Sequence, residues 1–166
     1  EDVRMIRAAR RVTDEGIGNV VLLGDAGRIN GMAEEAGISI DGIEVIDYLR
    51  EEGERDRYAL TLEQLRRHKG LSLQDARRQT EDPAMYACLM VREGAADAVI
   101  GGLSSYYPET IRPALQVLQV EEGRSIVSSV YLVVVRGTAY FFTDCAVNIE
   151  PTAEQLEVAE ASLLAC

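Results

Sequence analysis

The stretch ADAVIGGLSSYYPETIRPALQVLQV, residues 96–120, indicates the fold class of this chain. Its apolar run at 98–100 is stopped by two glycines, which is typical of the end of a buried strand. The polar segment 104–108 contains a proline and predicts a loop, and helical spacing begins at Thr110. The apolar residues expected on one face of that helix are Ile111, Ala114, Leu115 and Leu118. Strand, loop and helix in this order predict one unit of an α/β fold.

The start of this helix is a candidate anion site. Thr110 is a good N-cap, which would place Pro113 at the third helical position and Arg112 in the first turn. Free backbone N–H groups, the positive end of the helix dipole and a guanidinium would then converge. The alternative is an ordinary solvated arginine in a common strand–loop–helix unit, and the pattern alone leaves both open.

Strand and helix patterns alternate over the first two thirds of the chain. The expected strands are 20–23 and 43–46, and the expected helices are 1–15, 29–36, 58–68 and 74–78, the last capped by Ser72, with another opened by Asp82 and Pro83. The charged run 50–57 is read as a solvated face or loop. The alternation predicts an α/β fold with a mainly parallel sheet.

After residue 122 the character of the sequence changes. Residues 125–135 are rich in β-branched side chains, and 138–143 form a second such run after Arg136 and Gly137. Together they predict an antiparallel hairpin, and a final helix is expected from residue 151. We therefore expect residues 1–122 to form most of a first α/β domain and residues 123–166 to begin a second one.

The composition excludes several classes of protein. With 47% hydrophobic and 27% charged residues the chain of 166 residues is globular, and its formal charge of −11 argues against a nucleic-acid partner. No apolar run approaches a membrane span, and the N-terminus is too charged for a signal peptide. The three cysteines are far apart and lack metal-ligand spacing, so we expect a reducing, cytoplasmic setting and no metal site.

A second positive cluster lies at 66–69, where three of the four residues are Arg or Lys. A helix C-terminus explains such a cluster, because cations complement the dipole there. His68 has no acidic or nucleophilic neighbour in sequence and is read as a surface residue. Cys145 has no neighbour that would lower its pKa and is read as a buried structural thiol. Asp144 and Asn148 fit turn and capping roles.

Six ordered segments resemble one family. They are EGIGNVVLLGD (15–25), LRRHKGLSLQDA (65–76), GAADAVIGG (94–102), TIRPALQVL (110–118), SIVSSVYL (125–132) and TDCAVNIEPTAEQL (143–156). Their order and spacing resemble phosphate acetyltransferases and butyryltransferases over nearly the whole chain. The same module resembles the C-terminal part of bacterial NADP-dependent malic enzymes, where it is thought to sense acetyl-CoA without catalysis.

The resemblance implies acyl exchange between CoA and phosphate in a cleft between two α/β domains. The implied fold is three-layered and similar to isocitrate and isopropylmalate dehydrogenases, and family members usually dimerise through the second domain. CoA or acetyl-CoA would be substrate or effector, with no bound cofactor. Carried over by motif, the residues expected to bind the substrates are Arg66, Arg112, Ser104, Ser105, Tyr107, Thr110, Asp144 and Asn148.

Two departures from the family pattern matter. Active members carry a His or Ser/Thr-rich triplet before the helix, whereas this chain has Tyr106 and Tyr107 there, which is closer to the malic-enzyme version. The family also continues beyond Cys166, and its catalytic residues are expected in that part. The resemblance thus implies a partial module whose activity belongs to the complete protein. A working transferase and an acetyl-CoA-sensing domain both stay open.

Overall fold

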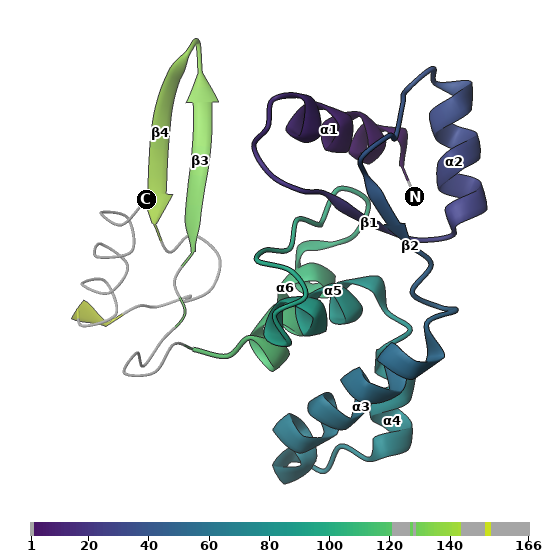
Figure 1. The fold of residues 1–166 in the computed structure, drawn as a ribbon. Coiled ribbons are helices and arrows are strands. Elements are labelled where there is room, and N and C mark those ends of the chain that lie inside the picture. Colours follow the sequence, from purple (N-terminus) through teal and green to yellow (C-terminus); the bar gives the residue numbers. More distant parts are fainter. Residues whose placement is uncertain (1, 121–126, 128, 144–151, 154–166) are drawn as a thin grey trace. The chain divides into compact units, whose positions relative to one another are not determined.

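The computed structural model describes residues 2–120, 127, 129–143 and 152–153. The chain forms two compact units, residues 1–119 and residues 120–166. Within its described residues the first unit contains two strands, six α-helices and one 3-10 turn (Figure 1). In chain order they are α1 (Val3–Asp14), β1 (Val21–Leu23), α2 (Ala26–Glu35), β2 (Glu44–Ile46), α3 (Glu52–Arg66), η1 (Arg67–Lys69), α4 (Leu73–Gln79), α5 (Pro83–Arg92) and α6 (Tyr107–Val117). None of the described helices is long and apolar enough to cross a membrane.

The strands β1 and β2 pair in parallel, as the alternation of patterns predicts. Leu22 lies opposite Val45, and both pack on a small cluster formed by α1 and α2, which lie beside the sheet (Figure 1). Val21, Leu23 and Ile46 alternate with them and pack on a larger cluster. Since successive side chains of a strand point to opposite faces, the small sheet has helical clusters on both faces.

The larger cluster is the main core of the first unit. Leu62 of α3, Leu89 of α5 and Val117 of α6 are fully buried, together with Cys88 and Thr80. Three tyrosines extend this core, with the Tyr86 ring centroid 5.4 Å from that of Tyr48 and 5.0 Å from that of Tyr58. Cys88 is a free thiol whose pKa burial raises to about 11. It is therefore a packing residue in its thiol form.

Helix starts follow their cap residues. Ser72 Oγ accepts from the backbone N–H of Asp75 at 3.1 Å, and Asp82 Oδ1 accepts from that of Met85 at 2.8 Å, so both predicted caps are confirmed. The helix predicted over 29–36 begins three residues earlier, because Asp25 caps it. The charged run 50–57 is mostly helical, since α3 begins at Glu52. Its acidic residues in the first turn complement the helix dipole there.

The strand predicted at 98–100 is wrong. These residues are in neither a helix nor a strand, and Ile100 is 83% exposed. Ala96 and Val99 pack on the larger core cluster, which explains the apolar pattern. A strand needs a neighbour for its backbone N–H and C=O groups, and no described strand lies beside this segment. A short apolar run by itself does not distinguish a strand from a packed loop.

The start of α6 also differs from its prediction. The helix begins at Tyr107, so Thr110 is its fourth residue and not its N-cap, and Pro113 lies inside the helix. The Glu109 carboxylate accepts from the backbone N–H of Tyr106 at 3.1 Å, which fixes the earlier start. The buried face runs through Pro113 and Val117, with Ala114 and Leu118 beside it. Leu115, predicted on that face, is 42% exposed.

The described part of the second unit contains a hairpin of β3 (Val130–Val135) and β4 (Thr138–Thr143). The strands are antiparallel, and both loop residues have positive φ, 52° at Arg136 and 82° at Gly137. This two-residue loop matches the right-handed twist of the strands, and the predicted hairpin is confirmed. Residues 125, 126 and 128 of the predicted run, and nearly all of the helix predicted from residue 151, lie outside the described residues.

Candidate anion-binding site

The C-terminus of α3 bends the chain around a small open recess. Arg66 is the last residue of α3, and the 3-10 turn that follows ends at Gly70, whose φ of 83° is accessible to glycine without strain. The N–H of Gly70 donates to the Arg67 carbonyl at 2.9 Å, and that of Leu71 to the Arg66 carbonyl at 3.4 Å. This reversal brings Arg66 and Lys69 to the same recess.

The recess has a volume of about 190 Å3, which is below the ~300–1,000 Å3 of sites that enclose a drug-sized ligand. It has room for one small group such as a phosphate. Besides Arg66 and Lys69 it is lined by Gly70, Leu71, Asp75, Gln79 and Gln116. Three helices and the 66–71 turn therefore contribute to it.

The balance of charge in the recess is positive. Neither Arg66 nor Lys69 is in an ion pair with any residue that the structure describes. The one carboxylate among the described lining residues, that of Asp75, accepts from Ser72 Oγ at 2.6 Å and pairs with the Arg78 guanidinium. Ser72 and then Arg78 lower the pKa of Asp75. Arg78, which does not line the recess, therefore offsets the charge of Asp75. Arg66 and Lys69 remain available to bind an anion.

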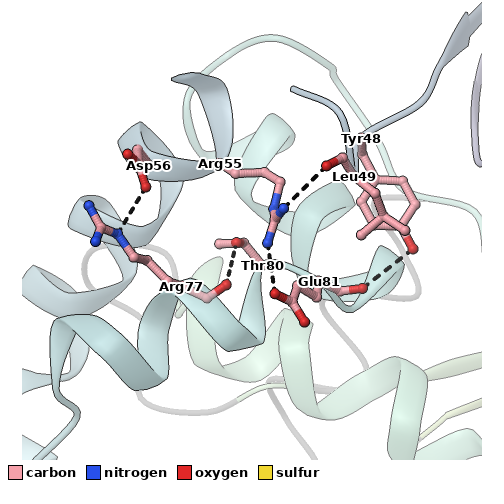
Figure 2. A network of polar contacts seen from close by, with 7 residues as sticks. All are labelled: Tyr48, Leu49, Arg55, Asp56, Arg77, Thr80 and Glu81. Atoms are coloured by element: carbon pink, nitrogen blue, oxygen red, sulfur yellow. Dashed lines mark hydrogen bonds and ion pairs between the residues drawn. The ribbon is translucent and has the colours of Figure 1, made fainter. Parts of the chain in front are cut away.

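A polar network fixes α4, which carries Asp75 and Gln79, against α3 (Figure 2). Arg77 Nε lies 2.9 Å from Asp56 Oδ1, and the Arg55 guanidinium lies 3.0 Å from Glu81 Oε1. At the same place Tyr48 Oη donates to the Glu81 carbonyl at 3.4 Å, and Thr80 Oγ1 to the Arg77 carbonyl at 2.8 Å. The recess is thus built on packed and tethered helices, as a binding site requires.

A second set of predicted residues gathers at the start of α6. Ser105 Oγ lies 2.9 Å from Thr110 Oγ1, and the Thr110 side chain lies against Gly101 and Gly102. A methyl group added at Gly102 would stand 3.5 Å from Thr110 Oγ1, and the φ of 93° there favours glycine. Ser104 and Tyr107 are exposed close by in the chain, and we refer to the turn, the two hydroxyls and these two residues as the polar surface at the start of α6.

The predicted convergence of helix dipole, free N–H groups and Arg112 is wrong in its geometry. Arg112 is the sixth residue of α6, one turn beyond the free N–H groups, because the helix starts at Tyr107. The Glu109 carboxylate already occupies the helix start. Arg112 is exposed and lies four residues before Gln116, on the same side of α6. It thus neighbours the residue that α6 contributes to the recess without lining the recess itself.

The structure therefore divides the predicted site residues into two groups. Arg66 lies in the recess, and Ser104, Ser105, Tyr107, Thr110 and Arg112 lie on the first two turns of α6 and the loop before it. Asp144 and Asn148, like Cys145, lie outside the described residues. His68 is exposed in the 3-10 turn, and the described residues contain no group of metal-ligating side chains.

Six described residues of the recess are absent from the predicted site: Lys69, Gly70, Leu71, Asp75, Gln79 and Gln116. In the sequence, Lys69 belongs to the positive cluster at 66–69 and to the segment 65–76, Gln116 belongs to the segment 110–118, and Gln79 lies in no motif. Only the four-residue spacing from Arg112 could have pointed to Gln116.

One family profile matches nearly the whole chain. The family described as "Phosphate acetyl/butaryl transferase" matches residues 1–165. Three relatives are each named phosphate acetyltransferase. The protein of Thermoanaerobacterium thermosaccharolyticum is 38% identical over 92% of this chain, that of Escherichia coli 36% over 94%, and that of Nitratidesulfovibrio vulgaris 35% over 92%. The chain spans 48% of the length of the first and 22% of the other two.

Solved structures agree with these matches. A phosphotransacetylase from Streptococcus pyogenes superposes with a TM-score of 0.81 at 27% identity, over 96% of this chain and 49% of the other. The EutD phosphotransacetylase from Staphylococcus aureus superposes with a TM-score of 0.78 at 24% identity, over 93% and 46%, and supports the fold alone. The mixed α/β fold predicted from the sequence is confirmed.

Proposed function

The chain belongs to the phosphate acetyl/butaryl transferase family, and on that premise we propose that it serves acetyl or short-acyl exchange between CoA and phosphate. In this reaction a phosphate oxygen attacks the thioester carbonyl, a C–O bond forms and the C–S bond breaks. CoA leaves as the thiolate, which receives the proton that the hydrogen phosphate loses. Both substrates are rich in phosphate oxygens, so the protein must supply cations that are not already paired.

The recess at Arg66 is the observation that carries this proposal. Two cations without an ion-pair partner among the described residues, Arg66 and Lys69, share a phosphate-sized recess with a carboxylate that is offset by Arg78. We assign to it a phosphate group of the substrates, with Arg112 as a second arginine on the neighbouring α6. A planar guanidinium donates two parallel N–H groups to phosphate oxygens, which suits both arginines to this role.

The polar surface at the start of α6 is proposed to contact the reacting end of the substrates. The hydroxyls of Ser104, Ser105 and Thr110 are donors for a phosphate or carbonyl oxygen, and the Gly101–Gly102 turn lets a ligand approach the backbone. Asp144 and Asn148 are proposed as further substrate-binding residues of the complete protein. The remaining catalytic residues are proposed to lie in the part of the family's length that this chain does not span.

Tyr106 and Tyr107 favour a second candidate, the acetyl-CoA-sensing domain of a malic enzyme. Tyr106 is 80% exposed immediately before α6, and Tyr107 is half-exposed as its first residue. A ring at this place occupies space that phosphate needs to attack the thioester. A reacting group misplaced by ~1 Å can lower a rate ~100-fold, so such a ring suits binding without turnover. In that case acetyl-CoA would bias a conformational equilibrium.

We also propose a domain organisation, a cellular location and an oligomeric state from the family resemblance. We propose residues 1–122 as the first domain and residues 123–166 as the start of a second, in a fold like that of isocitrate and isopropylmalate dehydrogenases. We propose a cytoplasmic homo-oligomer joined through the second domain. The exposed apolar residues of the hairpin support association, because Leu132, Val134, Phe141 and Phe142 are each at least half exposed within this chain.

Formation of acetyl phosphate from acetyl-CoA and phosphate tests the proposal, with the protein expressed at its full natural length. The transferase predicts turnover that depends on both substrates. The sensing domain predicts calorimetric binding of acetyl-CoA without turnover, and a Tyr107→Ser variant that gains activity. Absence of both binding and turnover in a folded protein would reject both candidates.

A further inference from the structure

Among the described residues, Gln116 is the one that α6 contributes to the recess, and its backbone is firmly held. Its neighbour Val117 is fully buried in the main core, and the Val117 carbonyl accepts from Arg92 Nη1 at 3.5 Å. The helix packs on α5 and α3 through the same face. Gln116 therefore lines the same recess as Arg66 and Lys69 from a rigid element.

The chemistry of an amide suits this position. It is neutral, and its NH2 group donates two hydrogen bonds. A carboxylate of nearly the same shape would instead face Arg66 and Lys69, pair with them and cancel the positive potential of the recess. Gln79 of α4 is the other amide that lines the recess, and it is likewise a neutral donor. The carboxylate of the described lining, Asp75, is already occupied by Ser72 and Arg78.

We propose that Gln116 is a specificity-determining residue of the recess. Its amide donates to a phosphate oxygen, and its neutrality leaves Arg66 and Lys69 free to bind a phosphate ester dianion. This inference rests on the proposed function in taking the ligand to be a phosphate group of CoA. It assigns to Gln116 a role in binding and none in the reacting step.

Gln116→Glu tests the charge, and Gln116→Met tests the donors, in the full-length protein. Gln64→Glu is the matched control, because Gln64 is exposed on α3 and lies outside the recess while the change in charge is the same. The Kd for CoA is measured by calorimetry at low and high salt, and KM for acetyl-CoA and kcat are measured in parallel. Circular dichroism and the unfolding temperature verify that each variant is folded.

We expect Gln116→Glu to raise Kd and KM about tenfold or more, with kcat changed less than about twofold. The loss should shrink at high salt, because added ions screen the new charge. Gln116→Met should raise Kd by a smaller factor that is insensitive to salt, and it decides the proposal if Gln116→Glu does not fold. Gln64→Glu should match the wild type.

Equal Kd values for Gln116→Glu and Gln64→Glu would overturn the inference, as would wild-type affinity in Gln116→Met. If the wild-type protein forms acetyl phosphate from acetyl-CoA and phosphate, neither result would contradict the proposed exchange reaction. If the wild type instead binds CoA without turnover, the exchange reaction fails while the comparison of Kd values still decides the role of Gln116.

Discussion

The Arg55 guanidinium in the first turn of α3 lies 3.0 Å from the Glu81 carboxylate, which stands in the turn between α4 and α5 (Figure 2). A second nitrogen of the same group donates to the Leu49 carbonyl at 3.2 Å. Arg55 therefore ties together the loop before α3, α3 itself and the end of α4. The Arg55 side chain is only 19% exposed, whereas that of Glu81 is 58% exposed, so the guanidinium end of the pair is the shielded one.

Replacing Arg55 by methionine should destabilise the protein by about 1.5–3 kcal/mol, the range for hydrogen bonds to charged groups. The substitution keeps most of the apolar stem and leaves the Leu49 carbonyl without this donor. Arg50→Ala is the control, because Arg50 is 80% exposed in its pair with Asp47 and such pairs contribute ~0–1 kcal/mol. Urea unfolding measures both. Equal losses in the two variants would contradict a structural role for the Arg55 network.

The buried face of α6 can be tested directly. Val117→Ala should cost about 1.5–3 kcal/mol, because it removes two methyl groups with no exposed surface, at about 0.8 kcal/mol each, and leaves a cavity. Leu115→Ala removes a larger side chain but should cost less than ~0.5 kcal/mol, since Leu115 is 42% exposed. Thermal or urea unfolding compares the two. A larger loss of stability for Leu115→Ala than for Val117→Ala would indicate that Leu115 lies on the buried face of α6, as the sequence pattern predicted.

Asp75 should give the protein a measurable dependence on acid. Ser72 and Arg78 lower the pKa of Asp75 below its ordinary value of 3.8. A carboxyl with a lowered pKa in the folded state stabilises it above the ordinary pKa, and this stability is lost as the pH falls through the folded-state value. Asp75→Asn should therefore unfold at a lower temperature than the wild type at neutral pH, and the gap should close below pH 3.8. A gap that is constant with pH would show that ionisation of Asp75 is not involved.

Local signals in the sequence predicted most elements of the first unit. The side-chain oxygens of Ser72 and Asp82 each accept a hydrogen bond from the backbone N–H three residues later. Because these caps are local, the helices begin close to where they were expected. The hairpin is equally local, because Arg136 and Gly137 adopt the positive φ that its short loop requires. The family motifs pointed to Arg66 as a binding residue, and Arg66 lines the recess.

What the sequence could not supply depends on partners distant in the chain. The segment 98–100 has an apolar pattern, but its burial comes from packing on the core and not from pairing with a described strand. Thr110 is a good N-cap residue, but α6 begins before it, because the Glu109 carboxylate accepts from the backbone N–H of Tyr106. Gln116 reaches the recess only because α6 packs beside α3, 50 residues after Arg66, and no local pattern records that proximity.

The recess at Arg66 carries the proposed function, and the neighbouring Arg67 is the matched control that tests it most directly. Arg66 lines the recess, whereas Arg67, which carries the same charge, is exposed and lies outside it. The measurement is the Kd for CoA of the full-length Arg66→Ala and Arg67→Ala variants, alongside KM for acetyl-CoA where there is turnover. We predict a loss of about tenfold or more for Arg66→Ala, equivalent to ~1.4 kcal/mol, and a change below about twofold for Arg67→Ala. Equal affinities in two folded variants would contradict the assignment of the recess as a phosphate site.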